Sequence, residues 1–423
     1  MEYQLLRGGI KLSKRVEGPK IELLAPAGSL EKLKTAIRFG ADAVYLGGNK
    51  LNLRAFADNF SDEELIEAVT FAHSRNCRVY VTVNVFPHND DLIGLEDYLL
   101  RLYEIKVDAI IASDPGVIMT ARDVTPNLEI HLSTQANNVN WKSMLFWYKQ
   151  GVKRIVVARE LSLDEIRKAK DILPDDLQLE AFVHGSMCVA YSGRCLLSSY
   201  MTGRDSNRGE CAQPCRYKYN LTEEKRPNEY FPIIEDEKGT YIMNSKDLCM
   251  IEHIPELAEA GIDSFKIEGR MKSSYYVATV VKSYREAIDA YLADPKGYEF
   301  QQKWMDNLFK ASHRKFYTGF YFGDKASQIY STSSYIRDYD IVGIVKKYNL
   351  ESNTAIIEQR NKIFEGDKVE ILRPNCDTFD VHLKELTDEK GNKIPATPVA
   401  QMKYTAKVEA PLKMDDMLMK FKG

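Results

Sequence analysis

Short apolar runs alternate with longer amphipathic stretches along most of the chain. The runs are rich in Val, Ile, Leu and Ala, and such short continuous runs are typical of strands buried on both faces of a parallel sheet. Eight of them are evident, at residues 21–25, 43–46, 79–83, 109–112, 129–132, 155–158, 179–183 and 264–267. The pattern therefore predicts eight strands in a parallel sheet.

Helical periodicity fills the intervals between these runs. Ser29 precedes the first helical stretch as an N-cap, and Ser61 starts a capping box with Glu64. Further helices are expected at 92–103, 116–122, 140–148, 163–172, 246–260 and 273–292. Such alternation is typical of a (β/α)8 barrel, whereas a doubly wound sheet usually needs a phosphate-binding glycine loop after its first strand. The Ala-Pro-Ala-Gly sequence at 25–28 is not such a loop, so we predict an α/β fold of the TIM-barrel type.

The barrel pattern is even except for one long interval, and it changes near residue 313. Between the seventh and eighth strands lies a long insertion that carries cysteines. Beyond the barrel, turns separate strand patterns at 340–346, 354–359, 367–372 and 404–408. We expect a basic N-terminal extension (1–20), the barrel (21–312) with its insertion (186–245), a linker (313–334) and a small antiparallel β-barrel domain (335–423).

Composition adds limits to this picture. The chain has 423 residues, of which 44% are hydrophobic, and a formal net charge of -3 at pH 7. A nearly balanced charge means that any RNA-binding surface must be a local basic patch. Lys346, Lys347, Arg360 and Lys362 in the C-terminal domain are one candidate, for which a structural or dimer-forming role is the alternative. With no long apolar run and no signal-peptide pattern, we expect a cytoplasmic protein without a membrane span.

Four of the seven cysteines lie in the insertion. They are Cys188, Cys195, Cys211 and Cys215, and Cys249 follows downstream. Disulfides need an oxidising compartment, and structural zinc usually shows paired ligands at short spacing, which only the last two cysteines of the insertion provide. A [4Fe-4S] cluster takes one thiolate per iron and tolerates irregular spacing. The spacing therefore favours an iron–sulfur cluster and leaves zinc and disulfides as alternatives.

Polar residues follow the C-terminal ends of the predicted strands, where barrel enzymes hold their active sites. The candidates for catalysis are Arg54, Asp114, Arg159, His184, Glu268 and Arg270, and those for substrate binding are Asn84, Ser133, Gln135 and Lys272. The three arginines could converge on carboxylates or a phosphate, because a guanidinium pairs with such groups bidentately. Alternatively, Arg159 pairs with Glu160 and Arg270 with Glu268 across neighbouring strands.

Proton transfer and nucleophilic catalysis have weaker support in the sequence. His184 and Asp114 are candidates for proton transfer. His184 also lies four residues before Cys188, which allows a cysteine–histidine pair, but no third, orienting group is evident. The chain contains neither an H-E-x-x-H zinc motif nor a G-x-S-x-G nucleophile elbow.

Several segments resemble the signature of peptidase family U32, the collagenase-like proteins. The longest is Glu180-x-Phe182-x2-Gly185-Ser186-Met187-Cys188-x4-Ser192-Gly193-x-Cys195-x-Leu197-Ser198. The segments ELLAPAG at 22–28, GADAVY at 40–45, HLSTQ at 131–135 and KIEGRMK at 266–272 are similar to the same family. The resemblance covers nearly the whole chain.

The resemblance also implies an activity. The branch that combines a barrel with one small β-domain, and that this chain resembles most, hydroxylates the wobble uridine of tRNA to 5-hydroxyuridine without oxygen, using prephenate and a [4Fe-4S] cluster. It implies Cys188, Cys195, Cys211 and Cys215 as cluster ligands, with Cys249 as the alternative fourth ligand. The implied partners are the anticodon region of tRNA and the iron–sulfur assembly machinery, and a homo-oligomer is left open. A collagenase-like peptidase and a hydroxylase of another RNA or of a quinone are the alternative functions.

Overall fold

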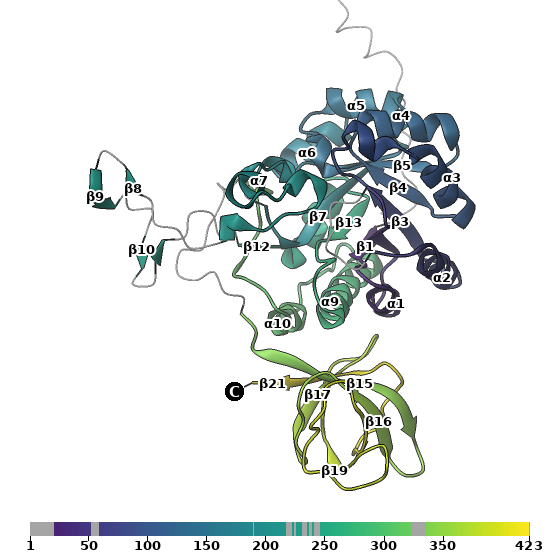
Figure 1. Cartoon of the computed structure of the whole chain (residues 1–423), viewed down its shortest axis with the longest axis vertical. Helices are drawn as coiled ribbons and strands as arrows, with labels where there is room; N and C mark the ends of the chain where they lie inside the picture. Colours follow the sequence, from purple (N-terminus) through teal and green to yellow (C-terminus); the bar gives the residue numbers. More distant parts are fainter. Residues whose placement is uncertain are drawn as a thin grey trace, which may run out of the picture.

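The computed structural model describes residues 21–51, 59–188, 190–216, 246–323 and 336–422, and the backbone of four short strands between 222 and 240. Within these residues the chain forms a barrel of strands and helices and a separate, smaller sheet, which lies below the barrel in Figure 1. The expected N-terminal extension and the candidate Arg54 lie outside the described residues.

Eight parallel strands form the barrel (Figure 1). They are β1 (Glu22–Pro26), β2 (Ala43–Gly47), β3 (Arg78–Val83), β4 (Ala109–Ala112), β5 (Glu129–Leu132), β6 (Arg154–Val156), β7 (Gln178–Ser186) and β13 (Ser264–Ile267). Each strand pairs with the next, and β13 pairs with both β7 and β1, which closes the ring. The predicted (β/α)8 barrel is therefore confirmed.

Helices surround this ring. They are α1 (Leu30–Arg38), α2 (Asp62–His73), α3 (Leu95–Ile105), α4 (Pro115–Val124), α5 (Trp141–Lys149), α6 (Leu163–Lys170), α8 (Ile254–Glu259) and α9 (Ser274–Ala293). The Ser29 side chain accepts a hydrogen bond from the backbone N–H of Lys32, and Ser61 forms its capping box with Glu64. Both predicted helix starts are confirmed, because a serine hydroxyl replaces hydrogen bonds that the first turn cannot make internally.

The helix expected at 246–260 is wrong in its first half. Asp247–Cys249 form strand β12, which pairs antiparallel with β7 and parallel with β14 (Phe316–Tyr317). Strand β7 is longer than its neighbours, and its C-terminal extension forms backbone hydrogen bonds with β12. The residue pattern of 246–260 alone cannot show that such a pairing partner exists. The start of the expected linker thus packs onto the barrel sheet. Helix α10 (Gln302–Lys310) was not predicted.

Among its described residues, the cysteine insertion (186–245) contains one short α-helix, α7 (Leu197–Thr202). Two strand pairs follow. They are β8 (Thr222–Glu223) with β9 (Arg226–Tyr230), and β10 (Glu235–Asp236) with β11 (Gly239–Thr240).

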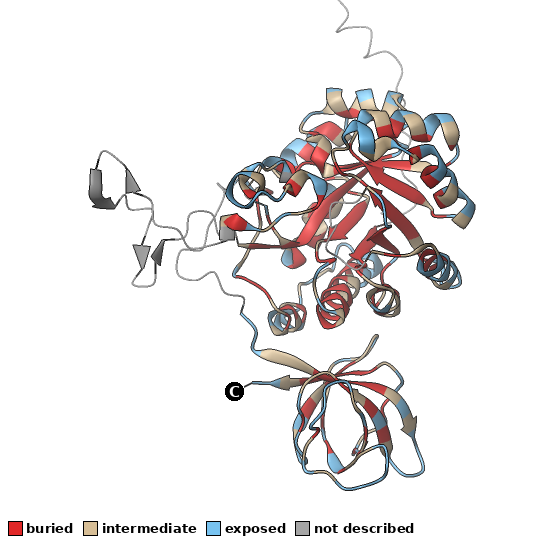
Figure 2. Cartoon of the chain, viewed as in Figure 1, coloured by how far each residue is buried: buried red, intermediate tan, exposed pale blue. Residues whose placement is uncertain are grey.

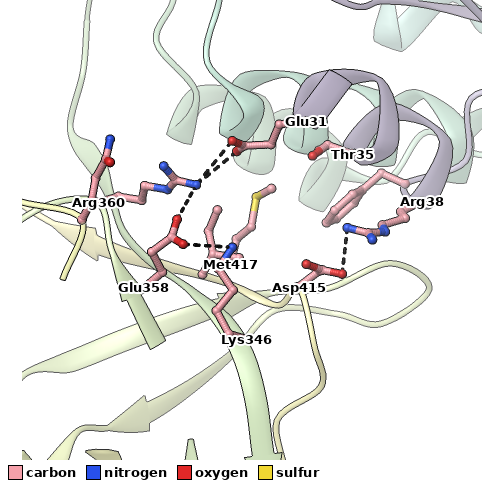
Figure 3. A pocket seen from close by; sticks show the side chains of 11 residues that line it. Glu31, Thr35, Arg38, Lys346, Glu358, Arg360, Asp415 and Met417 are labelled. Atoms are coloured by element: carbon pink, nitrogen blue, oxygen red, sulfur yellow. Dashed lines mark hydrogen bonds and ion pairs between the residues drawn. The ribbon is translucent and has the colours of Figure 1, made fainter. Parts of the chain in front are cut away.

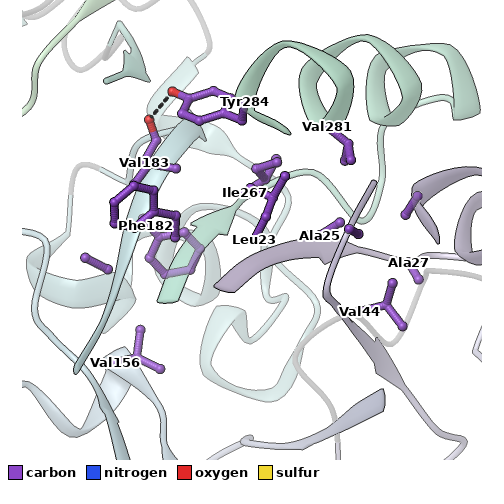
Figure 4. Packing of buried hydrophobic residues seen from close by; sticks show 14 of the residues in the cluster. Leu23, Ala25, Ala27, Val44, Val156, Phe182, Val183, Ile267, Val281 and Tyr284 are labelled. Carbon is purple, nitrogen blue, oxygen red and sulfur yellow. Dashed lines mark hydrogen bonds between the residues drawn. The ribbon is translucent and has the colours of Figure 1, made fainter. Parts of the chain in front are cut away.

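The strands of the barrel are buried on both faces, as Figure 2 shows. On the outer face, Leu23 and Ile267 join Val281 of α9 in the main hydrophobic cluster (Figure 4). Side chains alternate along a strand, so neighbouring residues point into the ring. Among them, Leu24 and Tyr80 belong to a second, small cluster. The apolar outer layer packs the strands against the helices, and the interior of the barrel holds polar as well as apolar side chains.

Seven antiparallel strands make up the C-terminal sheet. They are β15 (Tyr339–Asn349), β16 (Thr354–Gln359), β17 (Lys368–Leu372), β18 (Phe379–His382), β19 (Lys384–Thr387), β20 (Lys403–Lys407) and β21 (Met417–Phe421). Their order is β18-β17-β21-β15-β16-β20-β19, and the sheet curls around its own apolar cluster, which includes Val345, Ile357 and Leu418. The antiparallel C-terminal domain is confirmed, whereas β18, β19 and β21 were not predicted.

A charged cavity of about 430 Å³ lies between α1 and the C-terminal sheet (Figure 3). Across it, Arg38 pairs with Asp415 at 2.7 Å. Glu358 pairs with Arg360 at 2.9 Å and with Lys346 at 3.3 Å. Two of the four cations considered for RNA binding are therefore already paired with carboxylates.

In the ranges that the structure describes, no helix is both long and apolar enough to cross a membrane.

Candidate active site

The barrel interior near the N-terminal ends of the strands holds a network of ion pairs, which we call the floor network. It consists of Glu22 on β1, Arg154 on β6, Glu180 on β7 and Lys266 on β13. Arg154 donates hydrogen bonds to Glu22 and, at 3.2 Å, to Glu180. Lys266 donates to Glu180 at 2.6 Å. Each of these side chains is at most 7% exposed and has an opposite charge beside it.

Burial and charge act in opposite directions on the carboxyls of the floor network. Burial of Glu22 favours its neutral form, but the Arg154 guanidinium, the Tyr80 hydroxyl and the charge of Arg78 together outweigh burial and lower the pKa of Glu22 to about 2. Burial likewise opposes ionisation of Glu180, and Lys266 together with Arg154 lowers its pKa below the ordinary value. Both carboxyls are therefore ionised at neutral pH, and the network fills this part of the barrel with satisfied charges.

Arg159 lies at the opposite end, which we call the mouth, just after β6. Its guanidinium stacks on the ring of Phe182 at 3.9 Å from the ring centroid and donates to the backbone carbonyl of Ser186 at 2.9 Å. A second guanidinium nitrogen is 3.8 Å from a carboxylate oxygen of Glu268. The acidic partner of Arg159 is thus Glu268, and the alternative of an Arg159–Glu160 pair is wrong, because Glu160 binds the insertion instead.

Other predicted residues surround the same opening. Arg270 is buried and donates to the Thr82 hydroxyl at 3.1 Å. The side-chain amide of Asn84 lies 3.5 Å from the Ser133 hydroxyl and 3.4 Å from the side-chain oxygen of Gln135. The Asn84 side-chain oxygen is buried and has no hydrogen-bond partner among the described residues. The barrel therefore brings these residues together from β3, β5 and β13.

His184 points away from this group of residues. Its ring lies 5.4 to 6.0 Å from the ring centroids of Tyr276, Tyr284 and Phe316, and its Nδ1 is 3.5 Å from the Tyr284 hydroxyl. Burial, followed by the positive charges of His313 and Lys272, lowers the pKa of His184 to about 3. A neutral imidazole packed against α9 is placed to support the fold.

Two further candidates make contacts that stabilise the rim. Asp114 accepts a hydrogen bond from the backbone N–H of Val117 at 3.1 Å and caps α4. Lys272 donates to the backbone carbonyl of Ser312 at 3.3 Å and lies over the ring of Tyr276 at 5.2 Å. The catalytic role of Asp114 and the substrate-binding role of Lys272 stay predictions.

The cysteine insertion folds back onto the mouth. Glu160 accepts hydrogen bonds from the backbone N–H and the hydroxyl of Ser192 at 2.6 and 2.7 Å. Arg194 donates to the backbone carbonyl of Gln135 at 2.8 Å. These contacts attach the insertion to the residues that follow β6 and β5, so it covers part of the opening.

Cys188 lies at the start of the cysteine insertion, just after β7. Although Cys188 reaches the surface, the surrounding loop desolvates its thiol and raises its pKa, and the thiols of Cys195 and Cys211 raise it further. The backbone N–H of Ala190 and the charge of Arg159 act in the opposite direction. Arg159 also donates to the backbone carbonyl of Ser186, so the arginine of the mouth adjoins the segment that carries Cys188.

The donors on this loop suit an iron–sulfur cluster chemically. Such clusters are bound by thiolates, and hydrogen bonds to their sulfurs tune them; here the backbone N–H of Leu197 donates to the Cys195 sulfur at 3.3 Å. As the described side chains stand, no three His, Cys, Asp or Glu residues converge closely enough to hold a metal ion. The iron–sulfur cluster and its four ligands therefore stay predictions.

Cys249 belongs to the hydrophobic core. It lies opposite His184 in the pairing of β12 with β7, and burial raises its pKa to about 12. The buried surroundings of Cys249 make it the less suitable ligand. Cys215 is favoured as the fourth ligand, because it is partly exposed and lies on the insertion. The choice between the two stays a prediction.

Comparison with known proteins identifies the family. The family model described as Peptidase family U32 matches residues 28–330, and that of the Peptidase family U32 C-terminal domain matches residues 337–418. The chain belongs to peptidase family U32. The family resemblance that the sequence motifs suggested is thereby confirmed.

Relatives in this family carry two kinds of name. The chain is 46% identical over 385 residues to tRNA hydroxylation protein P1 of Bacillus subtilis, covering 90% of both chains. It is 37% identical over 420 residues to tRNA hydroxylation protein P of Escherichia coli, covering 90% of this chain and 92% of the relative. A protein named Collagenase from Porphyromonas gingivalis is 33% identical over 381 residues, covering 87% of this chain and 90% of the relative.

Sequence reasoning missed two aromatic residues of the mouth. Phe182 carries the Arg159 guanidinium on its ring. Tyr317 on β14 is near enough for Arg159 to lower its pKa, although burial dominates and raises that pKa to about 12. The alternation of Glu180 and Phe182 along β7 was a signal that both face the interior. For Tyr317 no such signal existed, because its place depends on the pairing of β14 with β12.

Proposed function

We propose that this chain is a tRNA hydroxylase that converts the wobble uridine to 5-hydroxyuridine without oxygen, with prephenate as co-substrate and a [4Fe-4S] cluster on the cysteine insertion. Relatives 37% to 46% identical over about 90% of the chain are named tRNA hydroxylation proteins, which supports hydroxylation of tRNA. The finer proposal rests on one contact: Arg159 donates to the carbonyl of Ser186, two residues before Cys188, at 2.9 Å. A carboxylate-binding group of the mouth therefore adjoins the cysteine loop.

The two described arginines of the mouth suit a dicarboxylate such as prephenate. Arg159 is 14% exposed, so its guanidinium can reach a ligand while Phe182 and Glu268 hold its plane in position. Arg270 comes from the neighbouring side of the barrel and is held by Thr82. Two guanidinium groups from different strands would bind two carboxylates of one small molecule and fix its orientation.

The uracil ring would lie between this co-substrate and the insertion. The unpaired oxygen of Asn84 is an acceptor for an N–H of the base. The contacts of Glu160 and Arg194 with the mouth hold the insertion as a cover that excludes water. A [4Fe-4S] cluster, when bound to the cysteines, supplies one-electron redox chemistry.

Nucleoside mass spectrometry of tRNA tests this function directly. A strain that lacks the gene should lose 5-hydroxyuridine and its derivatives, and the wild-type gene should restore them. Unchanged nucleosides in the deletion strain would refute the proposal.

Protein purified without oxygen should contain iron and show the broad visible absorbance of a cluster. Alanine at Cys215 should remove that absorbance and alanine at Cys249 should not; the reverse result would assign the fourth ligand to Cys249.

A peptidase is the second candidate, because one relative is named Collagenase. Cysteine peptidases need a base within hydrogen-bonding reach of the nucleophile. His184, the nearest candidate in the sequence, has the Tyr284 hydroxyl at 3.5 Å and a pKa of about 3. This environment leaves His184 unsuited to activate a Cys188 nucleophile and makes the peptidase the weaker proposal.

A further inference from the structure

An exposed apolar ridge lies on α7 and its N-cap residue, at the surface of the cysteine insertion. It consists of Leu196, Tyr200 and Met201, whose exposed fractions are 74%, 89% and 47%. The backbone N–H of Tyr200 donates to the carbonyl of Leu196 at 2.9 Å, so these two side chains lie one helical turn apart on the same face. Burying such large side chains would release free energy, which marks the ridge as a contact surface.

The ridge borders both the candidate cluster ligands and the mouth. Leu196 directly follows Cys195 in the chain. The backbone N–H of Ala212 donates to the Ser198 hydroxyl of α7 at 3.0 Å, which places the segment with Cys211 against the helix. The same insertion is attached to the mouth through Glu160 and Arg194, as described above. A macromolecule that delivers one group into the mouth would therefore pass beside the ridge.

The charge around the ridge is positive. Residues 190–215 contain three arginines, against one aspartate and one glutamate. Arg194 and Arg204 flank α7 in sequence and are exposed. Arg208 pairs with Asp91 at 2.6 Å, and Lys346 and Arg360 of the C-terminal sheet pair with Glu358. A basic surface that carries an exposed aromatic ring suits single-stranded nucleic acid, whose phosphates and bases need these two kinds of contact.

We propose that the ridge is a stacking platform for unpaired bases of the tRNA anticodon loop, with the Tyr200 ring as its main contact. The inference rests on the proposed function and adds the surface on which the RNA docks. An enzyme that modifies a base must take that base out of its stack, and the neighbouring bases then lose a stacking partner. The Tyr200 ring replaces that partner beside the mouth, and the arginines of the insertion attract the backbone.

RNA binding by single-residue variants tests the platform. The probe is a synthetic anticodon stem-loop, and a hairpin of the same stem without unpaired anticodon bases is the RNA control. Affinity would be measured by fluorescence anisotropy with the full-length, anaerobically purified protein. Tyr200→Ala should weaken stem-loop binding by about 5- to 150-fold, the range of one lost base–aromatic stack. Tyr200→Phe should restore it, because the ring stacks without its hydroxyl.

Tyr103→Ala is the matched protein control, since Tyr103 lies on α3 and is 44% exposed. It should bind the stem-loop as the wild type does, and neither tyrosine should affect the control hairpin. Equal stem-loop affinity of Tyr200→Ala and Tyr103→Ala would overturn the platform. So would a loss of iron in Tyr200→Ala, since the ridge would then only support the insertion.

The platform and the proposed function can fail separately. If wild-type protein hydroxylates tRNA while Tyr200→Ala binds the stem-loop normally, the platform alone is wrong. If the wild type binds the stem-loop through Tyr200 but a deletion strain keeps its 5-hydroxyuridine, the hydroxylation is wrong and the platform stands.

Discussion

The two ends of the barrel interior use similar side chains for opposite purposes. In the floor network, every charge has an opposite charge in contact, and the four side chains are almost fully buried. At the mouth, Arg159 is partly exposed, its carboxylate partner is 3.8 Å away, and the side-chain oxygen of Asn84 has no partner among the described residues. Polar groups whose hydrogen bonds and charges are fully paired stabilise a fold, whereas groups that are incompletely paired are available to bind a ligand. Changes at the floor should therefore alter stability, and changes at the mouth should alter activity.

The largest expected effect is on activity, at the mouth. Arg159→Ala should lower tRNA hydroxylation by about 100-fold or more, because the variant lacks the charged group that would orient the proposed co-substrate. Its iron content and thermal unfolding should match those of the wild type. Arg167→Ala on the exposed face of α6 is the control and should keep full activity. A fully active Arg159→Ala variant would contradict the expectation that changes at the mouth alter activity.

The next effect is on stability, at the floor. Glu22→Gln should lower the free energy of unfolding of the barrel by about 3–5 kcal/mol, because it leaves Arg154 buried with less compensating charge. Denaturant unfolding would measure it. Glu67→Gln, which removes a carboxylate that is 55% exposed, should change stability by less than about 0.5 kcal/mol. Equal effects of the two substitutions would show that the floor network does not support the fold.

The pH dependence of stability sharpens the same contrast. The pKa of Glu22 falls from 4.5 to about 2 on folding, so its contribution is complete above pH 4.5 and is lost as the pH falls toward 2. Linkage puts that contribution at about 3 kcal/mol. The free energy of unfolding of the wild type, measured between these pH values, should fall more steeply than that of Glu22→Gln. Parallel curves would contradict the lowered pKa.

The smallest effect is expected where the barrel meets the C-terminal sheet. Arg38 and Asp415 form an ion pair at 2.7 Å, but their side chains are 33% and 27% exposed, so solvent screens the pair. Arg38→Ala should cost less than about 1 kcal/mol in thermal unfolding experiments. A larger loss would mean that this junction, like the floor, depends on its charges.

The predicted strands agree closely with the observed ones because a buried strand carries its own signal. The apolar runs at 43–46 and 109–112, for example, are too short for a buried helix, so their length favours a strand in a sheet covered on both faces. The candidate mouth was predicted for the same reason: once the barrel is recognised, residues such as Asn84 and Arg270 must follow strand ends at one rim. Strand β12 was misread because its partner, β7, lies far away in sequence.

The amino-acid sequence by itself determined the barrel, the C-terminal domain and the rim at which polar residues gather, since these depend on local periodicity and on connection order. Only the tertiary structure decided which polar residues face one another. His184 turns toward α9 because the register of β7 against β13 shifts between Lys266 and Ile267, and Arg159 meets Glu268 across an intervening strand. Such contacts depend on strand register and side-chain direction, and neither is encoded in a short segment of sequence.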